Sequence, residues 1–239
     1  MKKHGFTLAE VLVTLGIIGV VAALTLPTFT ARTQSAKVGP ALAKASASFS
    51  QSAKAMLNNF SADSLSSMYF CNDGNLSCAD NNKILSFKSD TTDASGQLFW
   101  QQFSNFMSGS EVAPANLPGG SIPDAGVYGF QSADGTIFWL KNFAKAFSAG
   151  TNNKSVGSIL VIDINGTKEP NKEARDQFTF HVLDNGTLLP YGSTSLVAQN
   201  QNGQGTDTWQ TKCQQNALPD NAAFCAGHVF ENGLKVEYK

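Results

Sequence analysis

Charged side chains are scarce in this chain. Asp, Glu, Lys and Arg together make up 15% of its 239 residues, compared with roughly 25% in an average protein. The formal net charge is −1, and no basic patch favours binding to nucleic acid. The three histidines show no metal-ligand spacing, and no nucleophile, general base or metal cluster typical of an enzyme is evident. These absences favour a structural or binding protein, and we do not expect an enzyme.

The N-terminus, by contrast, is strongly patterned. Lys2 and Lys3 precede an apolar run that extends from Phe6 to Leu26. As a helix this run is about 31 Å long, which matches the hydrocarbon thickness of a bilayer. Its one formal charge is Glu10, and a carboxylate costs about 2.5–3.5 kcal/mol at the bilayer centre, and less near the edge, unless it is paired. The two lysines predict a cytoplasmic N-terminus and an exported C-terminal domain.

Three interpretations compete for this segment. A secretory signal peptide would end in a cleavage site with small residues at alternating positions, whereas this run ends in Thr-Leu-Pro-Thr-Phe. A plain membrane anchor explains the length and the lysines, but not Gly5-Phe6 or Glu10. The third interpretation uses all of these residues, since the hexapeptide GFTLAE after a short basic leader resembles the type IV prepilin signal. Type IV pilins and type II secretion pseudopilins share that signal.

The resemblance implies a processing route and a set of partners. A prepilin peptidase and N-methyltransferase would cut between Gly5 and Phe6 and methylate the new N-terminal Phe6. Glu10 would then pair with the N-terminal amine of a neighbouring subunit during assembly, and a close amine and carboxylate attract strongly in a low dielectric. Other pilin or pseudopilin subunits and an inner-membrane assembly platform are the expected partners. The sequence departs from the pattern at Ala9, where a larger aliphatic residue is common.

The remaining chain predicts an α+β fold of the pilin type, with one long N-terminal helix packed on a mostly antiparallel sheet. Apolar residues at spacings of 3, 4 and 7 predict that the helix continues past the membrane. A kink is expected at Pro27, and a second bend or a short break at Gly39-Pro40. Phe99–Met107 reads as a short buried helix. The predicted segments are a leader (1–5), a transmembrane or filament-core helix (6–26), an amphipathic helix (27–60), a variable connection (61–124), and an antiparallel sheet with a C-terminal disulfide loop (125–239).

Strand signals cluster after residue 125. Alternating or β-branched runs are separated by Asp134-Gly135 and Asp184-Asn185-Gly186, which are typical of tight turns, so we expect about four strands or more. A further hairpin is predicted at Val229–Val236.

Four cysteines without a C-x-x-C pattern favour two disulfides in an exported domain. Three pairings are open, and we prefer Cys71–Cys78 with Cys213–Cys225 because each closes a short loop. Reduced structural cysteines are the alternative.

An oxygen-rich segment lies between two predicted strands, and it resembles a D-x-N-G…P-N…D-x-F segment of pseudopilin-like proteins. It departs from that segment at Ala174, where Gly is usual. Asp163, Asn165 and Asp176 are candidate ligands for calcium, which major type II pseudopilins bind near their sheet. The other interpretation is a turn stabilised by Asp163 and Asn165, with Asp176 paired to Arg175 or Lys172. We favour the turn, and we expect no other cofactor.

The preferred function is a pseudopilin or minor pilin of a type II secretion pseudopilus or a type IV pilus. It would be a single-pass protein of the inner membrane, with its C-terminal domain periplasmic or extracellular until it joins a filament. A pilin-anchored adhesin or DNA-uptake minor pilin is the alternative, and an enzyme or solute-binding domain on a pilin-type anchor is the least favoured.

Overall fold

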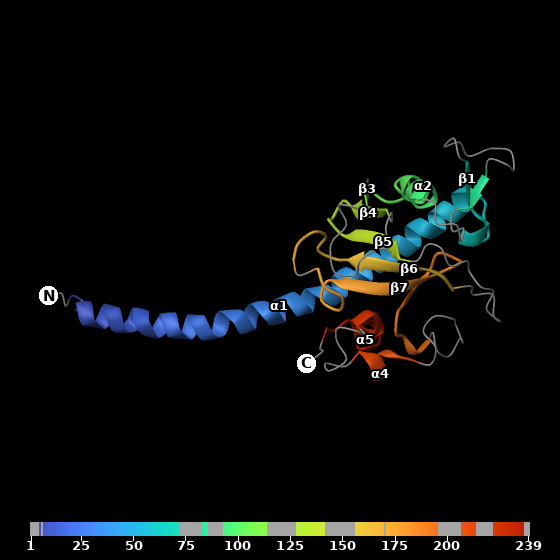
Figure 1. Ribbon diagram of the computed structural model, residues 1–239. Helices are drawn as coiled ribbons and strands as arrows, with labels where there is room; N and C mark the ends of the chain where they lie inside the picture. Colours follow the sequence, from blue (N-terminus) through green and yellow to red (C-terminus); the bar gives the residue numbers. More distant parts are fainter. Residues whose placement is uncertain are drawn as a thin grey trace. The chain divides into compact units, whose positions relative to one another are not determined.

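The computed structural model describes residues 5, 7–71, 83–85, 93–113, 128–141, 156–169, 171–195, 207–213 and 222–236. The chain forms two compact units, Met1–Lys37 and Val38–Lys239, which we describe separately. One helix, α1 (Leu8–Asn59), supplies residues to both units (Figure 1).

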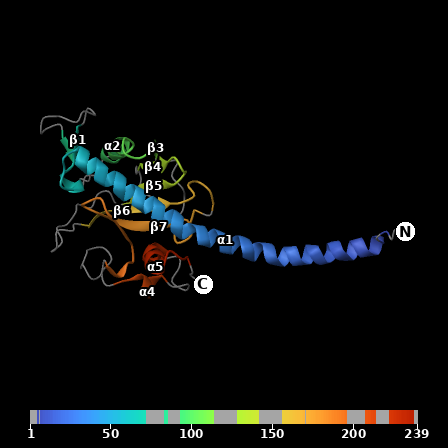
Figure 2. The same cartoon turned by 180° about the vertical axis from the view of Figure 1, so that it is seen from behind.

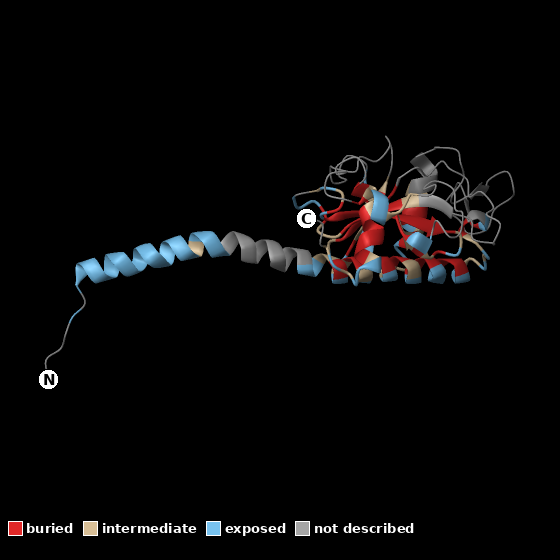
Figure 3. Cartoon of the chain, turned by 90° about the horizontal axis from the view of Figure 1, so that it is seen from below, coloured by how far each residue is buried: buried red, intermediate tan, exposed pale blue. Residues whose placement is uncertain are grey.

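In the first unit, α1 is a membrane-length apolar helix. The window Leu8–Thr25 has a mean hydropathy of 2.3, and none of it is buried inside the structure. Figure 3 shows this part of the helix exposed except at one position, Ala22, which is half-buried. By length and composition it is able to cross a bilayer, in agreement with the predicted span.

The helix continues without interruption into the second unit. Its 52 residues include Pro27 and the Gly39-Pro40 pair, both inside the helical range. The predicted long helix is therefore confirmed, whereas a break at Gly39-Pro40 is wrong.

The second unit contains a six-stranded antiparallel sheet in which every strand pairs with its neighbours in sequence. Two of its connections are tight turns, Asp-Gly between β4 and β5 and Asn-Gly between β7 and β8. Gly135 and Gly186 have φ values of +92° and +76°, which a residue without a Cβ adopts readily. The strands are β3 (Gly109–Val112), β4 (Gly129–Ser132), β5 (Ile137–Lys141), β6 (Val156–Asp163), β7 (Gln177–Leu183) and β8 (Leu188–Pro190).

The segment predicted as an irregular connection holds more structure than expected. It contributes the edge strand β3 to the sheet, and β1 pairs with β2 in a separate two-stranded sheet. The predicted short aromatic helix exists as α2 but starts earlier and ends at Phe103. The additional elements are η1 (Leu65–Ser67), β1 (Tyr69–Cys71), β2 (Lys83–Leu85) and α2 (Asp93–Phe103).

Within the second unit, α1 lies along one face of the sheet, as Figures 1 and 2 show from opposite sides. The main core of buried side chains is formed by α1, α2 and the sheet. Phe49 of α1 is fully buried, and its ring centroid lies 5.1 Å from that of Phe103 and 6.0 Å from that of Phe138. Trp100 joins this aromatic cluster, and its indole N–H donates to the Tyr128 carbonyl at 2.9 Å. The predicted apolar stripe of α1 is thus the face on which the sheet packs.

The C-terminal region is helical where a hairpin was predicted, so the hairpin at Val229–Val236 is wrong. Its elements are α4 (Trp209–Lys212), η5 (Ala222–Phe224) and α5 (Cys225–Glu231). Asn232-Gly233 ends α5 instead of turning between two strands, and Gly233 has a φ of +68°. An Asn-Gly pair suits both structures because both need a left-handed residue.

Candidate functional site

The segment with the predicted processing and assembly residues lies at the start of α1. Gly5 is exposed, and Phe6 lies outside the described residues. Glu10 is in the first turn of the helix and is exposed. Its role in assembly stays a prediction, because it concerns a neighbouring subunit.

Glu10 is nevertheless held in a defined position by its own chain. The backbone N–H and the hydroxyl of Thr7 both donate to Glu10 Oε2 at 2.8 Å, and the Glu10 N–H donates to Thr7 Oγ1 at 3.3 Å. This reciprocal pattern is a capping box, which satisfies two N–H groups at the helix start. A carboxylate is also favoured at this end by the helix dipole. The capping role of Thr7 was not predicted, although Thr-x-x-Glu before an apolar run is a sequence signal for such a box.

Below this first turn the helix presents an apolar surface with a shallow groove at Gly16. The groove has a volume of about 470 Å³ and is lined by Val13, Gly16, Ile17, Val20 and Val21. A Cβ added at Gly16 would meet no other atom within 4 Å. Small residues allow helices in membranes to approach closely, so this groove suits a second apolar helix.

The predicted calcium residues come together at the sheet end between β6 and β7. Asp163 is fully buried, and its carboxylate accepts from the Asn165 N–H at 3.1 Å and from the Gln177 side-chain amide at 3.0 Å. Asp176 accepts from the N–H groups of Asn171 and Lys172 at 2.8 and 2.7 Å, and from the Asn165 amide at 3.1 Å. The three residues therefore form one hydrogen-bonded network.

This network fits a closed turn better than a calcium site. All four carboxylate oxygens of Asp163 and Asp176 face N–H donors, which occupy the positions that a cation would need. Among the residues that the structure describes, no group of three or more His, Cys, Asp and Glu side chains gathers as metal ligands. The partners of Asp176 are two backbone N–H groups and the Asn165 side-chain amide, rather than the predicted Arg175 or Lys172 side chains.

Ala174 keeps the turn geometry that a glycine would adopt. Its φ is +65°, and its N–H donates to the Gln177 carbonyl at 2.9 Å. Its methyl group is buried with Cys213, Ala222 and Cys225. The left-handed conformation costs about 1–2 kcal/mol for a residue with a Cβ.

Two buried groups have displaced pKa values. Burial raises the pKa of Asp163 to about 7, and the nearby Asp176 carboxylate raises it further, against the hydrogen bonds from Gln177 and Asn165. Burial lowers the pKa of His181 to about 4. The His181 ring stacks on Tyr191 with centroids 4.7 Å apart, so it is neutral at pH 7 and packs as an aromatic side chain.

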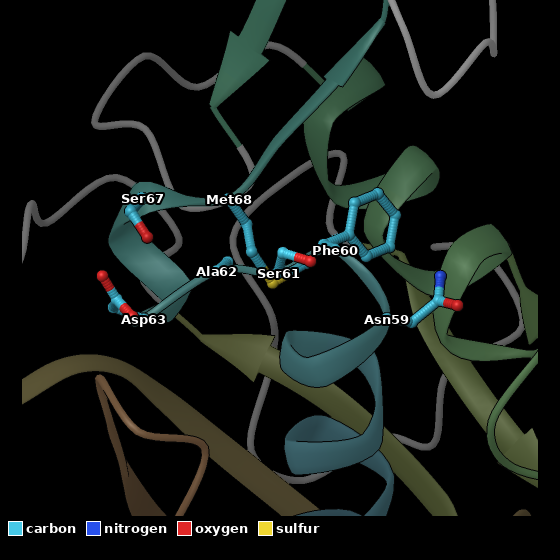
Figure 4. A pocket seen from close by; sticks show the side chains of 7 residues that line it. All are labelled: Asn59, Phe60, Ser61, Ala62, Asp63, Ser67 and Met68. Atoms are coloured by element: carbon cyan, nitrogen blue, oxygen red, sulfur yellow. The ribbon is translucent and has the colours of Figure 1, made fainter.

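A polar pocket lies beside the end of α1, where the chain turns toward η1 (Figure 4). Its volume is about 400 Å³, and Asp63 is its one charged lining residue. Ser61 takes a left-handed φ of +50° there, and the Ser61 and Ala62 N–H groups donate to the Asn58 and Leu57 carbonyls. This pattern is a helix C-cap of the Schellman type. The pocket brings no pair of titratable side chains together.

The cysteine predictions have separate outcomes. A disulfide joins Cys213 to Cys225, with their Cα atoms 5.0 Å apart, as predicted. Cys71 ends β1, and Cys78 lies outside the described residues, so the pairing of these two stays a prediction.

Comparison with known families identifies the N-terminal segment. Residues 1–26 match the family model described as the prokaryotic N-terminal methylation motif, which is the signature of type IV pilins and pseudopilins. No curated protein and no solved structure matches the chain. The motif supports a pilin-like or pseudopilin subunit, points to a structural role rather than an enzyme, and fits membrane anchoring by the apolar helix.

Proposed function

We propose that the protein is a structural subunit, a pseudopilin or minor pilin, of a type II secretion pseudopilus or a type IV pilus. The observation that carries this proposal is the match of residues 1–26 to the methylation motif, directly ahead of a folded α+β domain. An exported subunit that is first anchored in the membrane and then assembled needs both features. The helix anchors it, and the motif directs the N-terminal processing that precedes assembly.

The chemistry of the N-terminus supports this route. A cut between Gly5 and Phe6 would create an α-amino group four residues before Glu10. In the apolar interior of a filament each charge would offset the burial cost of the other, provided that they belong to neighbouring subunits and come within hydrogen-bond distance. The exposed apolar side chains of α1 would then pack against other helices instead of lipid. They are Leu8, Val11, Leu12, Val13, Leu15, Ile17, Ile18, Val20, Val21 and Leu24.

The proposed location and partners follow from the same segment. The protein would span the inner membrane once, with Lys2 and Lys3 on the cytoplasmic side and the sheet domain outside. A prepilin peptidase would act on it first, and the assembly platform and sister subunits would bind it next. The presence of Glu10 favours a position below the tip, because tip-capping pseudopilins often lack this carboxylate.

Mass spectrometry of the intact protein from its own cells tests the processing step. We expect a mature chain that begins at N-methylated Phe6, with all residues after Gly5 retained. A chain that still begins at Met1 would contradict the proposal. A cut after residue 26 would instead identify the segment as a secretory signal peptide.

A further inference from the structure

The Gly39-Pro40 pair is the weakest local sequence in the second half of α1. Pro40 has no N–H to donate to the preceding turn, and its ring crowds that turn. Glycine also disfavours a helix interior because of its backbone freedom. The pair comes directly after the boundary between the two compact units, yet the helix runs through it. Some contact outside the helix must therefore offset this weakness.

The contact is made by the end of the chain. Gly39 is buried against the backbone of Leu234, and a Cβ added at Gly39 would collide with the Leu234 carbonyl oxygen. The same added atom would lie 2.6 Å from the Leu234 carbonyl carbon and 2.9 Å from Leu234 Cβ. Only glycine lets the two backbones come this close.

The end of α5 delivers Leu234 to this position. Gly233 and Leu234 both have left-handed φ values, +68° and +62°. The Leu234 N–H donates to the Val229 carbonyl at 2.8 Å, which is the 6→1 bond of a Schellman cap. A left-handed conformation is unfavourable for a leucine. It is retained here because the turn presents the Leu234 backbone to α1.

Neighbouring side chains extend the contact, and α5 itself is firmly held. Val38 and Val236 are half-buried and pack against the main core. The carboxylate of Glu231, the last residue of α5, accepts from the Thr194 N–H at 2.7 Å and from the Trp209 indole N–H at 2.7 Å. The Cys213–Cys225 disulfide attaches the other end of α5 to the end of α4.

We propose that Gly233–Val236 forms a C-terminal clasp that keeps α1 helical at Gly39-Pro40. The clasp replaces the helix stability that the glycine and proline remove. It thereby allows one continuous helix to run from the membrane segment into the folded domain. Pro40 weakens the helix, so the helix requires an outside contact at this point. Gly39 has no side chain and therefore allows the Leu234 backbone to make that contact.

Hydrogen–deuterium exchange on the full-length protein in detergent micelles tests the clasp. We compare the wild type with Gly39→Ala and with a chain that ends after Gly233. The reporters are the α1 amides of residues 41–44, and the amides of β6 and β7 are the internal reference. Gly19→Ala is the matched control, since it is a Gly→Ala change in the same helix with no atom within 4 Å of the new Cβ. A chain that ends after Val236 is the control for truncation.

Opening of one helical turn, without global unfolding, predicts exchange about tenfold faster or more at residues 41–44 in the chain that ends after Gly233. In Gly39→Ala the acceleration should be smaller, because alanine favours the helix more than glycine does. The strand amides and both controls should match the wild type. Adding Pro40→Ala to the chain that ends after Gly233 should return exchange at residues 41–44 toward the wild-type rate, because the missing N–H is restored. This rescue separates the clasp from a general loosening of the domain.

Two results would overturn the clasp. One is unchanged exchange at residues 41–44 when the chain ends after Gly233. The other is an equal acceleration at residues 41–44 and in β6 and β7 that Pro40→Ala does not reverse, because the C-terminal residues would then stabilise the whole domain.

Discussion

At the scale of single residues, Asp163 couples stability to pH. Its pKa is about 7 in the folded protein, because it is buried, against an ordinary value of 3.8. The folded state therefore holds a proton that the unfolded state has lost, and the free energy of unfolding falls as pH rises from about 4 to about 7. Asp163→Asn removes this dependence, so the variant should gain stability relative to wild type as pH rises, by at most about 1.4 kcal/mol per pH unit.

Urea titrations of the two proteins at pH 5, 6, 7 and 8 measure this difference. His181 has a lowered pKa of about 4 and titrates with the opposite sign over part of this range, so the difference between the proteins isolates Asp163. Asp134→Asn is the control. Partial burial raises the pKa of Asp134, but hydrogen bonds from Lys44, Ser132 and Thr136 outweigh this and hold it below its usual range. Its carboxylate stays ionised from pH 5 to 8, so the control difference should be constant. Parallel curves for wild type and Asp163→Asn would rule out the raised pKa.

Thr7 positions the Glu10 carboxylate, and its hydroxyl makes two of the three hydrogen bonds between these residues. Thr7→Val keeps the shape but removes one donor to Glu10 and the acceptor for the Glu10 N–H. We expect the first turn of α1 to lose about 1 kcal/mol, the usual value of an N-cap. Hydrogen exchange of the Glu10 and Val11 amides in micelles measures the loss, because these two amides donate to Thr7. Thr7→Ser should retain the wild-type protection, and equal protection in Thr7→Val would show that the box is dispensable.

At the scale of the elements, the turn between β6 and β7 depends on Asp176 more than on any cation. Its carboxylate accepts hydrogen bonds from three N–H groups. Asp176→Ala removes the acceptor of all three hydrogen bonds. The expected loss is about 2–4 kcal/mol in the free energy of unfolding, measured by urea titration. Arg175→Ala, at the exposed neighbour, should stay within about 0.5 kcal/mol of wild type.

Thermal melting of the wild type and of Asp176→Ala tests whether this turn binds calcium. With every carboxylate oxygen of Asp163 and Asp176 facing an N–H group, we expect the melting temperature to be the same with calcium and with a chelator. A calcium-dependent rise that disappears in Asp176→Ala would reverse this expectation and restore the metal site.

Elements with a strong local pattern were predictable from the sequence, and elements that depend on context were not. The spacing of apolar residues along α1 specifies a helix, and the Asp134-Gly135 pair specifies a tight turn. Both signals depend only on residues close together in the sequence. The pair Asn232-Gly233 is an equally clear turn signal, but an Asn-Gly pair occurs both in hairpin turns and in helix C-caps. The sequence therefore did not distinguish the predicted hairpin from the C-cap that is present. Strand β3 was missed because Gly109 and Ser110 are exposed and only Val112 is buried, as expected of an edge strand. The packing of Leu234 on Gly39 joins residues almost 200 positions apart, which no local pattern records.

The candidate site divides in the same way. The sequence singles out Glu10 because its charge is unusual in an apolar run, and its role between subunits stays a prediction. The carboxylates Asp163 and Asp176 were expected in one turn, and their hydrogen bonds meet there. The backbone donors to Asp176 were not predictable, since backbone N–H groups carry no sequence signal. Ala174 is the clearest case, because its left-handed φ of +65° contradicts the ordinary preference of alanine and is imposed by the turn around it.

At the scale of the whole molecule, the central question is whether Glu10 acts on another subunit as well as on its own helix. The capping box occupies Oε2 with Thr7, and a carboxylate has further lone pairs for a second donor. Glu10→Ala removes both interactions, whereas Thr7→Val weakens only the intramolecular one. The two variants together separate helix capping from pairing between subunits.

We expect Glu10→Ala to be processed normally but to be incorporated poorly into filaments, because the amine of the neighbouring subunit would be buried without a partner. The cost of burying one unpaired charge is about 3–5 kcal/mol, enough to reduce incorporation more than a hundredfold. Quantitative mass spectrometry of sheared filaments, normalised to the processed subunit in the membrane, measures this. Thr7→Val should be incorporated at close to the wild-type level, and Glu10→Asp at a level between wild type and Glu10→Ala, because its shorter side chain reaches less far. If Glu10→Ala and Thr7→Val are reduced alike, the carboxylate acts through the helix cap alone, and the pairing between subunits is wrong.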